Sequence, residues 1–127
     1  MTKDLSLLED LQNALKRLKE AISEPETQMN KDATIQRFEF TFELAWKLMQ
    51  FILSEENVNS YGPKNAIREA AKFGLIESAE NWLEFAKMRN LATHTYNQEL
   101  ADKVYASCKG FPPQVEKFIN KVKLNQP

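Results

Sequence analysis

A long stretch without glycine or proline, from Asn30 to Glu55, places the strongest constraint on the fold. Its apolar residues recur three and four positions apart, which is the period of an α-helix. They fall into two sets on different sides of one cylinder, namely Ile35, Phe38, Phe42, Ala45, Met49 and Ile52, and Phe40, Leu44, Leu48 and Phe51. The stretch therefore predicts a helix that begins near Asn30 or Asp32, ends near Glu55 and lies at the centre of a bundle.

The polar residues of this helix form a narrow polar line, which consists of Gln36, Glu39, Glu43, Lys47 and Gln50. Within it, Glu43 and Lys47 are four positions apart and can form an ion pair. Glu39 and Glu43 could also be paired carboxylates for acid–base or metal chemistry, but metal sites of this kind need further ligands, such as Glu-x-x-His, and none is present. Arg37 stands among apolar neighbours. It is expected to lean toward a cleft or a carboxylate, which makes it a candidate supporting residue of a functional site.

The same helical spacing recurs through the rest of the chain. The expected helices are one capped by Asp4, one from Pro63 to the C-cap Gly74, one from about Ser78, and one from Asn97 that kinks or stops at residues 110–113 before a last segment at 115–124. Only three glycines and five prolines occur, and strand-type alternation is scarce. The fold class is therefore predicted to be all-α, with about five helices, the last one kinked at Pro112-Pro113. Residues 1–127 are expected to form one domain.

Composition limits the partners and the chemistry. The single cysteine, Cys108, excludes an intrachain disulfide and, with one histidine, leaves no zinc cluster, so it is interpreted as a packing residue. A net charge of −1 argues against indiscriminate binding to nucleic acid or anionic lipid, so any RNA contact must be local. No apolar run approaches the roughly 20 residues of a membrane span, and the N-terminus lacks the apolar stretch of a secretion signal. We expect a cytoplasmic protein with no membrane partner.

Chemistry is concentrated in the segment from Met88 to Tyr96, which contains Arg89, the only histidine, His94, and Tyr96. An imidazole can move protons near neutral pH, a guanidinium can hold a phosphate with two donors, and a phenol can accept a transferred group. Together they suggest phosphodiester chemistry. The competing structural interpretation makes Arg89 an ion-pair partner, His94 a helix-end residue and Tyr96 a core residue with an exposed hydroxyl. From these three residues alone, the structural interpretation is the more frequent outcome.

Ideal helix geometry separates the two basic side chains of this segment. His94 would lie about 140° around the helix from Arg89 and about 7.5 Å further along it. Either the helix loosens near Thr93-His94-Thr95, which contains two β-branched residues, or the working site is assembled from two copies of the chain. A charged arginine on a largely apolar face suits the second alternative, because it is costly in a sealed core but acceptable in a subunit cleft that holds anions.

A line of basic residues runs along the short helix after Pro63, and its members Lys64, Arg68 and Lys72 are four positions apart. A solvated surface is the ordinary interpretation of such a line. The functional interpretation is a track for the phosphate backbone of RNA.

Four segments carry a resemblance to a known family: IQRFEFTFELAWK at 35–47, GPKNAIREA at 62–70, GLI at 74–76, and Arg89-Asn90-x3-His94-x-Tyr96. They make the chain similar to the HEPN proteins encoded beside MNT-type minimal nucleotidyltransferases, also called nucleotidyltransferase substrate-binding proteins. The resemblance covers nearly the whole chain. One departure is FPP at 111–113, where the family more usually has a Tyr-Leu-Pro type of sequence, and this affects only the shape of the last turn.

The resemblance implies an up-and-down antiparallel helical bundle that forms a homodimer, with the Arg-x4-His motifs of both chains facing a shared cleft. In toxin members this cleft is a metal-independent endoribonuclease that acts on RNA such as tRNA, without a cofactor. His94 would then exchange protons with the ribose or the leaving oxygen, and Arg89 would hold the scissile phosphate as negative charge builds on it. Asn90 would orient that phosphate by hydrogen bonding.

The resemblance also implies a regulatory partner. A cognate MNT nucleotidyltransferase, the antitoxin, would use Mg-ATP to transfer AMP to Tyr96 and so switch the cleft off, with Thr93 and Thr95 as weaker acceptors. Two alternatives remain open. The chain could be a non-catalytic subunit that presents a substrate, or only Tyr96, to the partner enzyme, or it could be a plain helical scaffold without a ligand.

Overall fold

A computed structural model describes residues 2–124, with side chains from residue 6 onward. Its elements are α1 (Thr2–Ser23), α2 (Gln28–Glu55), α3 (Gly62–Phe73), α4 (Ala79–Leu91), the 3₁₀ helix η1 (Ala92–His94), α5 (Gln98–Cys108) and α6 (Phe111–Leu124). No strand occurs among these residues, which confirms the all-α prediction.

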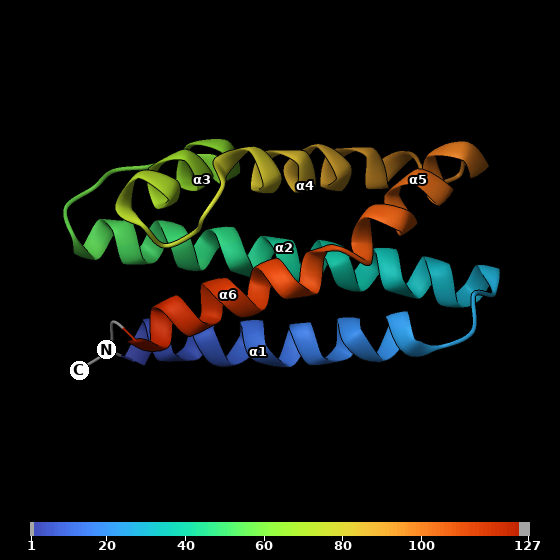
Figure 1. The fold of residues 1–127 in the computed structure, drawn as a ribbon, viewed down its shortest axis with the longest axis horizontal. Coiled ribbons are helices and arrows are strands. Elements are labelled where there is room, and N and C mark those ends of the chain that lie inside the picture. Colours follow the sequence, from blue (N-terminus) through green and yellow to red (C-terminus); the bar gives the residue numbers. More distant parts are fainter. Residues whose placement is uncertain (1, 125–127) are drawn as a thin grey trace.

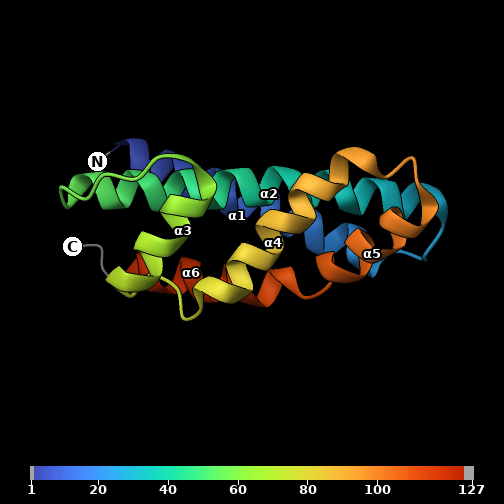
Figure 2. The ribbon, with the colours of Figure 1, turned by 90° about the horizontal axis from the view of Figure 1, so that it is seen from above.

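The helices form an up-and-down bundle around α2 (Figure 1). Helix α1 runs antiparallel to α2, α4 runs back along the other side of α2, and α5 and α6 return together, with α6 alongside α1. The short helix α3 lies obliquely across the C-terminal half of α2 (Figure 2). Because α2 contacts α1, α3, α4 and α5, its predicted central position is confirmed.

The predicted bounds of α2 need one correction. Its C-terminal end at Glu55 is as expected, but it begins at Gln28, because the side chain of Thr27 accepts a hydrogen bond from the backbone N–H of Asn30 and caps the helix. The two apolar sets also differ in burial. The first set is buried except for half-buried Ile52, whereas Phe40 of the second set is 48% exposed. Thus only one of the two apolar sides of α2 is almost completely buried.

Several predicted helix ends are confirmed by their capping interactions. The side chain of Ser78 caps α4 through the N–H of Asn81, and the side chain of Asn97 caps α5. Gly74 ends α3 in the left-handed conformation, with φ of 87°, which glycine adopts without strain. The expected cap at Asp4 is wrong, because α1 begins at Thr2 and Asp4 lies inside it.

The predicted kink at Pro112-Pro113 is also misplaced. Helix α5 ends at Cys108, and α6 begins at Phe111, so the break lies before the prolines and the bundle has six α-helices in the described residues rather than about five. Pro112 and Pro113 occupy the first turn of α6. A proline is tolerated there because the backbone N–H that it lacks would have no partner within the helix.

Aromatic rings form the centre of the core and hold α4 in place. Phe111 of α6 has no exposed surface, and the centroid of its ring lies 5.0 Å from that of Phe38, 5.3 Å from that of Trp82 and 4.7 Å from that of Phe85. Rings at such separations add attraction to the burial of apolar area. These contacts join α2, α4 and α6, and they fix the direction in which the opposite side of α4 points. Each helix among the described residues is too short or too polar to span a membrane.

Candidate functional site

The α-helical geometry of α4 ends within the segment that carries Arg89 and His94. The hydroxyl of Thr93 donates to the carbonyl of Asn90 at 3.0 Å, and the hydroxyl of Thr95 donates to the carbonyl of Ala92 at 3.1 Å. Side-chain bonds of this kind compete with regular helix hydrogen bonds. The chain continues as the 3₁₀ helix η1. The helix therefore loosens near Thr93-His94-Thr95, as one of the two alternatives from the sequence requires, but neither hollow beside α4 is lined by both Arg89 and His94.

Arg89 points toward the polar line of α2. Its Nη2 atom lies 3.4 Å from Oε1 of Glu43, and its side chain is 36% exposed. The same carboxylate oxygen accepts a hydrogen bond from Nε1 of Trp46 at 3.1 Å. The expected pair between Glu43 and Lys47 is present as a 3.8 Å contact to Oε2. Nε of Arg89 is buried and has no hydrogen-bond partner among the described residues, so one donor of the guanidinium is unused.

Glu39 shares the electrostatic environment of Arg89 and Glu43. Burial raises the pKa of Glu39 above its usual value, the positive charge of Arg89 opposes that rise, and the nearby Glu43 adds to it. The polar line of α2 therefore faces α4, and its carboxylates are partly removed from water. Within the part of the chain that the structure describes, no group of three or more metal-ligating side chains is arranged to hold a metal ion.

His94, the last residue of η1, and Tyr96, two residues further along the chain, lie together on the surface. Nδ1 of His94 is 3.2 Å from the hydroxyl oxygen of Tyr96, and the two rings meet edge to face at 78°. When the phenol donates to Nδ1, the neutral imidazole carries its own proton on Nε2. Tyr96 is 86% exposed, so its interpretation as a core residue is wrong.

Two hollows lie along α2 beside these residues. The first, of about 290 Å³, lies between α2, α3 and α4 and is lined by Phe42, Glu43, Trp46, Pro63, Lys64, Ala86, Arg89 and Asn90. The second, of about 520 Å³, lies between α2 and the η1 region and is lined by Asp32, Ala33, Ile35, Gln36, Glu39, Ala92, Thr95 and Tyr96. Arg89 and Asn90 therefore share one hollow, while Tyr96 borders the other. No hydrogen bond in the described chain joins Arg89 to His94.

The remaining basic candidates lie in different places. Lys64 reaches the hollow that contains Arg89, while Arg68 and Lys72 are exposed on the same helix, α3. Arg37 donates to the backbone carbonyl of Arg17 on α1 at 2.8 Å. Its contact is thus with a carbonyl of α1, and neither of the two hollows beside α4 is lined by it.

Sequence reasoning missed two members of the site. Glu43 was assigned a pair with Lys47 but not with Arg89, and Trp46 was assigned no role. A signal existed, because Glu43 and Trp46 are three positions apart on one side of α2 and belong to one of the family-like segments. The pairing of Glu43 with Arg89 could not be found in this way, because Arg89 belongs to another helix and lies 46 positions further along the sequence.

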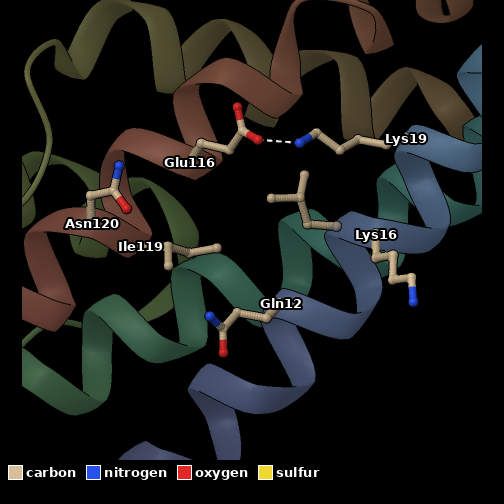
Figure 3. A pocket seen from close by; sticks show the side chains of 7 residues that line it. Gln12, Lys16, Lys19, Glu116, Ile119 and Asn120 are labelled. Atoms are coloured by element: carbon tan, nitrogen blue, oxygen red, sulfur yellow. Dashed lines mark hydrogen bonds and ion pairs between the residues drawn. The ribbon is translucent and has the colours of Figure 1, made fainter.

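Two other features of the molecule are not candidate sites for chemistry. Cys108 is fully buried, and burial raises the pKa of its thiol to about 12, so it is protonated at neutral pH and acts as a packing residue, as expected. A further hollow lies between α1 and α6, where Lys19 and Glu116 form an ion pair across it (Figure 3). Its lining contains no histidine, cysteine or aromatic side chain.

Comparisons with known proteins identify the family of this chain. The family model described as "Nucleotidyltransferase substrate binding protein like" matches residues 6–124. A Haemophilus influenzae protein described as "Probable ribonuclease HepT" is 43% identical over 82 residues, which cover 61% of this chain and 56% of that protein. The matched part thus spans little more than half the length of this relative.

Solved structures share the fold. A substrate-binding domain of a nucleotidyltransferase from Haemophilus influenzae has a TM-score of 0.82 and 30% identity, covering 91% of this chain and 98% of that one. A tri-AMPylated Shewanella oneidensis HEPN toxin, solved in complex with an MNT antitoxin, has a TM-score of 0.80 and 16% identity, covering 96% and 97% of the two chains. Because the family model covers nearly the whole sequence, the chain belongs to the nucleotidyltransferase substrate-binding-protein-like family, the HepT-like group of HEPN proteins.

Proposed function

We propose that this chain is the endoribonuclease subunit of a HepT-like toxin–antitoxin pair, and that it cleaves RNA such as tRNA without a metal ion. The observation that carries the proposal is the exposed pair of His94 and Tyr96, whose Nδ1 and hydroxyl oxygen are 3.2 Å apart. An imidazole free to exchange protons lies directly beside an accessible acceptor for a modifying group. Catalysis and its control would therefore use neighbouring atoms.

RNA carries its own nucleophile, so the protein has to supply only proton transfer and charge stabilisation. A base removes the proton of the 2′-hydroxyl, the 2′-oxygen attacks phosphorus, and the bond to the 5′-oxygen breaks as that oxygen receives a proton. His94 exchanges these protons, a contribution typically worth about 10²–10⁴-fold in rate. Arg89, whose side chain is 36% exposed and lines the same hollow as Asn90, holds the phosphate as negative charge develops, and Asn90 orients it.

The working unit in this proposal is a homodimer. Arg89 and His94 of one chain lie in different surroundings, which favours a site shared between two copies. Phe40, which is 48% exposed, supports the same idea, because together with Leu44 and Glu43 it lines a hollow between α1 and α2. A second copy on this face would cover the exposed ring beside the carboxylate that holds Arg89.

The proposed regulator is a cognate MNT-type nucleotidyltransferase. The phenol oxygen of Tyr96 attacks the α-phosphorus of Mg-ATP, the phenol loses its proton, and pyrophosphate leaves. The added AMP brings bulk and negative charge next to His94 and so excludes an RNA phosphate. The 86% exposure of Tyr96 supports its role as acceptor, and the modified Shewanella oneidensis toxin provides a precedent in a protein of the same fold.

The test is cleavage of total tRNA by the purified protein in the presence of a chelator. The wild type is expected to cleave, and His94→Ala and Arg89→Ala are each expected to remove cleavage. Mixing the two inactive variants is expected to restore part of the activity, because some dimers then contain one intact Arg89 and one intact His94. Cleavage that survives in both variants would overturn the assignment of the site.

A second candidate function is a non-catalytic subunit that presents Tyr96 or another substrate to the partner enzyme. The ion pair of Arg89 with Glu43 favours it, because the guanidinium is already partly satisfied within one chain. The same assay distinguishes the two functions. Absence of cleavage by the wild type, together with a stable complex with the nucleotidyltransferase, supports the presenting subunit.

A further inference from the structure

The hollow beside Arg89 contains an aromatic wall that the chemistry above does not use. Trp46 lines it together with Phe42 and Pro63. The indole is held in place by its hydrogen bond from Nε1 to Glu43, and it is only half-buried. A nucleobase can stack on such a ring whatever its sequence, since every base has an aromatic face. The wall is therefore a rigid, partly open platform.

Basic and polar groups surround this platform from two other helices. Arg89 and Asn90 come from α4, and Lys64 comes from the first turn of α3. Glu43 is the one acidic residue of the lining, against the two cations Arg89 and Lys64, so the hollow has an excess of positive charge. Its volume of about 290 Å³ is close to the lower limit of about 300 Å³ for small-molecule sites.

We propose that this hollow is a nucleotide subsite for single-stranded RNA, adjacent to the phosphate that is cleaved. The base of one nucleotide stacks on Trp46, and the phosphates on either side of its ribose contact Lys64 and Arg89. This inference rests on the proposed nuclease function and adds the recognition of a flanking nucleotide to it. The RNA then continues along α3, where Arg68 and Lys72 are exposed.

Binding of an uncleavable RNA tests the subsite without using cleavage as the readout. The probe is a 2′-O-methyl RNA hexanucleotide, which has no free 2′-hydroxyl to act as nucleophile. The chain has two tryptophans, and Trp82 is 1% exposed, so quenching of tryptophan fluorescence by the bound base reports on Trp46. Quenching is expected in the wild type and in His94→Ala, because His94 does not line this hollow.

Two variants and a matched control distinguish binding of RNA at this subsite from nonspecific attraction to positive charge. Trp46→Leu, followed by anisotropy of a labelled probe, is expected to weaken binding roughly 5- to 100-fold, the range for one stacked base. Lys64→Gln, an exposed change that leaves the core intact, is expected to reduce the slope of log K against log salt by about 0.7, which corresponds to one lost phosphate contact on a single strand. Lys16→Gln removes the same charge from the α1–α6 hollow, whose lining is drawn in Figure 3, and should leave both quantities unchanged.

The outcomes for the subsite and for the nuclease are distinct. If Lys64→Gln and Trp46→Leu bind the probe as Lys16→Gln does, the subsite is wrong, even if the wild type cleaves tRNA. If the variants bind as expected while the wild type cleaves no RNA, the subsite stands and the nuclease function is lost. Absence of quenching in the wild type, at probe concentrations that saturate anisotropy, also overturns the stacking on Trp46.

Discussion

The two sides of α4 differ in what their residues contact. On the inner side, Trp82, Phe85 and Met88 are buried and pack in the core, and the two aromatic rings contact the ring of Phe111 on α6. On the outer side, Arg89 meets a carboxylate of α2 and keeps one buried donor unused. The inner side of α4 is thus fully packed in the core, whereas Arg89 on the other side has one hydrogen-bond donor without a partner in the described chain. The comparison teaches that the core can hold α4 rigidly while the other side remains available for a ligand.

Energetically, the two sides should respond differently to substitution. Removal of a buried ring loses transfer free energy and leaves a cavity, whereas removal of an exposed polar side chain changes stability little. The outer side should therefore affect function almost alone. Four predictions follow that difference from its largest expected effect to its smallest.

Loss of the imidazole should have the largest effect on function. We expect His94→Ala to reduce the rate of RNA cleavage by about 10²–10⁴-fold, because proton transfer is lost. Since the side chain is exposed, the free energy of unfolding should change by less than about 0.5 kcal/mol. Cleavage kinetics and urea denaturation measure the two quantities. A large loss of stability in this variant would break the proposed separation between the two sides.

Loss of a core ring should do the opposite. Phe111→Ala is expected to lower the free energy of unfolding by about 3–5 kcal/mol, because the ring has no exposed surface and packs against four other rings. Thermal and urea denaturation measure this. Phe73→Ala is the matched control, since Phe73 is 47% exposed on α3 and its loss should cost about 1 kcal/mol or less. Equal losses for the two variants would contradict the assigned core.

Tyr96→Phe tests the exposed surface that follows α4 and η1. The variant lacks the acceptor oxygen, so intact-mass analysis after incubation with the nucleotidyltransferase and Mg-ATP should show one AMP-sized increment fewer than in the wild type. Cleavage should change by at most about tenfold, because the variant loses a single neutral hydrogen bond, worth about 0.5–1.5 kcal/mol. An unchanged mass pattern would remove Tyr96 from the mechanism of control.

The smallest effect concerns the partly buried carboxylate of Glu39 on α2, which lies near Arg89. The pKa of Glu39 is raised from 4.5, mainly by burial, so the folded state binds its proton more tightly than the unfolded state. Stability contributed by this proton is present below the ordinary pKa and is lost as the pH rises through the raised one. We therefore expect Glu39→Gln to be more stable than the wild type at pH 7, by less than about 1 kcal/mol, and to lose this advantage below about pH 4.5.

Thermal denaturation at several pH values measures this difference. Glu84→Gln, on the exposed surface of α4, removes the same charge and serves as the control. If both variants gain stability equally at pH 7, the effect comes from net charge, and the burial of Glu39 is not its cause.

Sequence alone determined where most helices lie and end, and which segment carries the reactive groups. Ser78, Asn97 and Gly74 marked helix ends correctly, because capping involves only residues a few positions apart. The break before α6 was placed too late, because prolines were interpreted as a kink although they fit the first turn of a new helix.

Tertiary structure alone decided which residues meet. Glu43 holds Arg89, Lys64 of α3 completes the hollow beside Trp46, and Arg37 faces α1 instead. These contacts depend on the distances and rotations between helices that are far apart in the chain, and the period of one helix contains no information about its neighbours. The local pattern thus specified the helices, while the packing of the aromatic core specified the site.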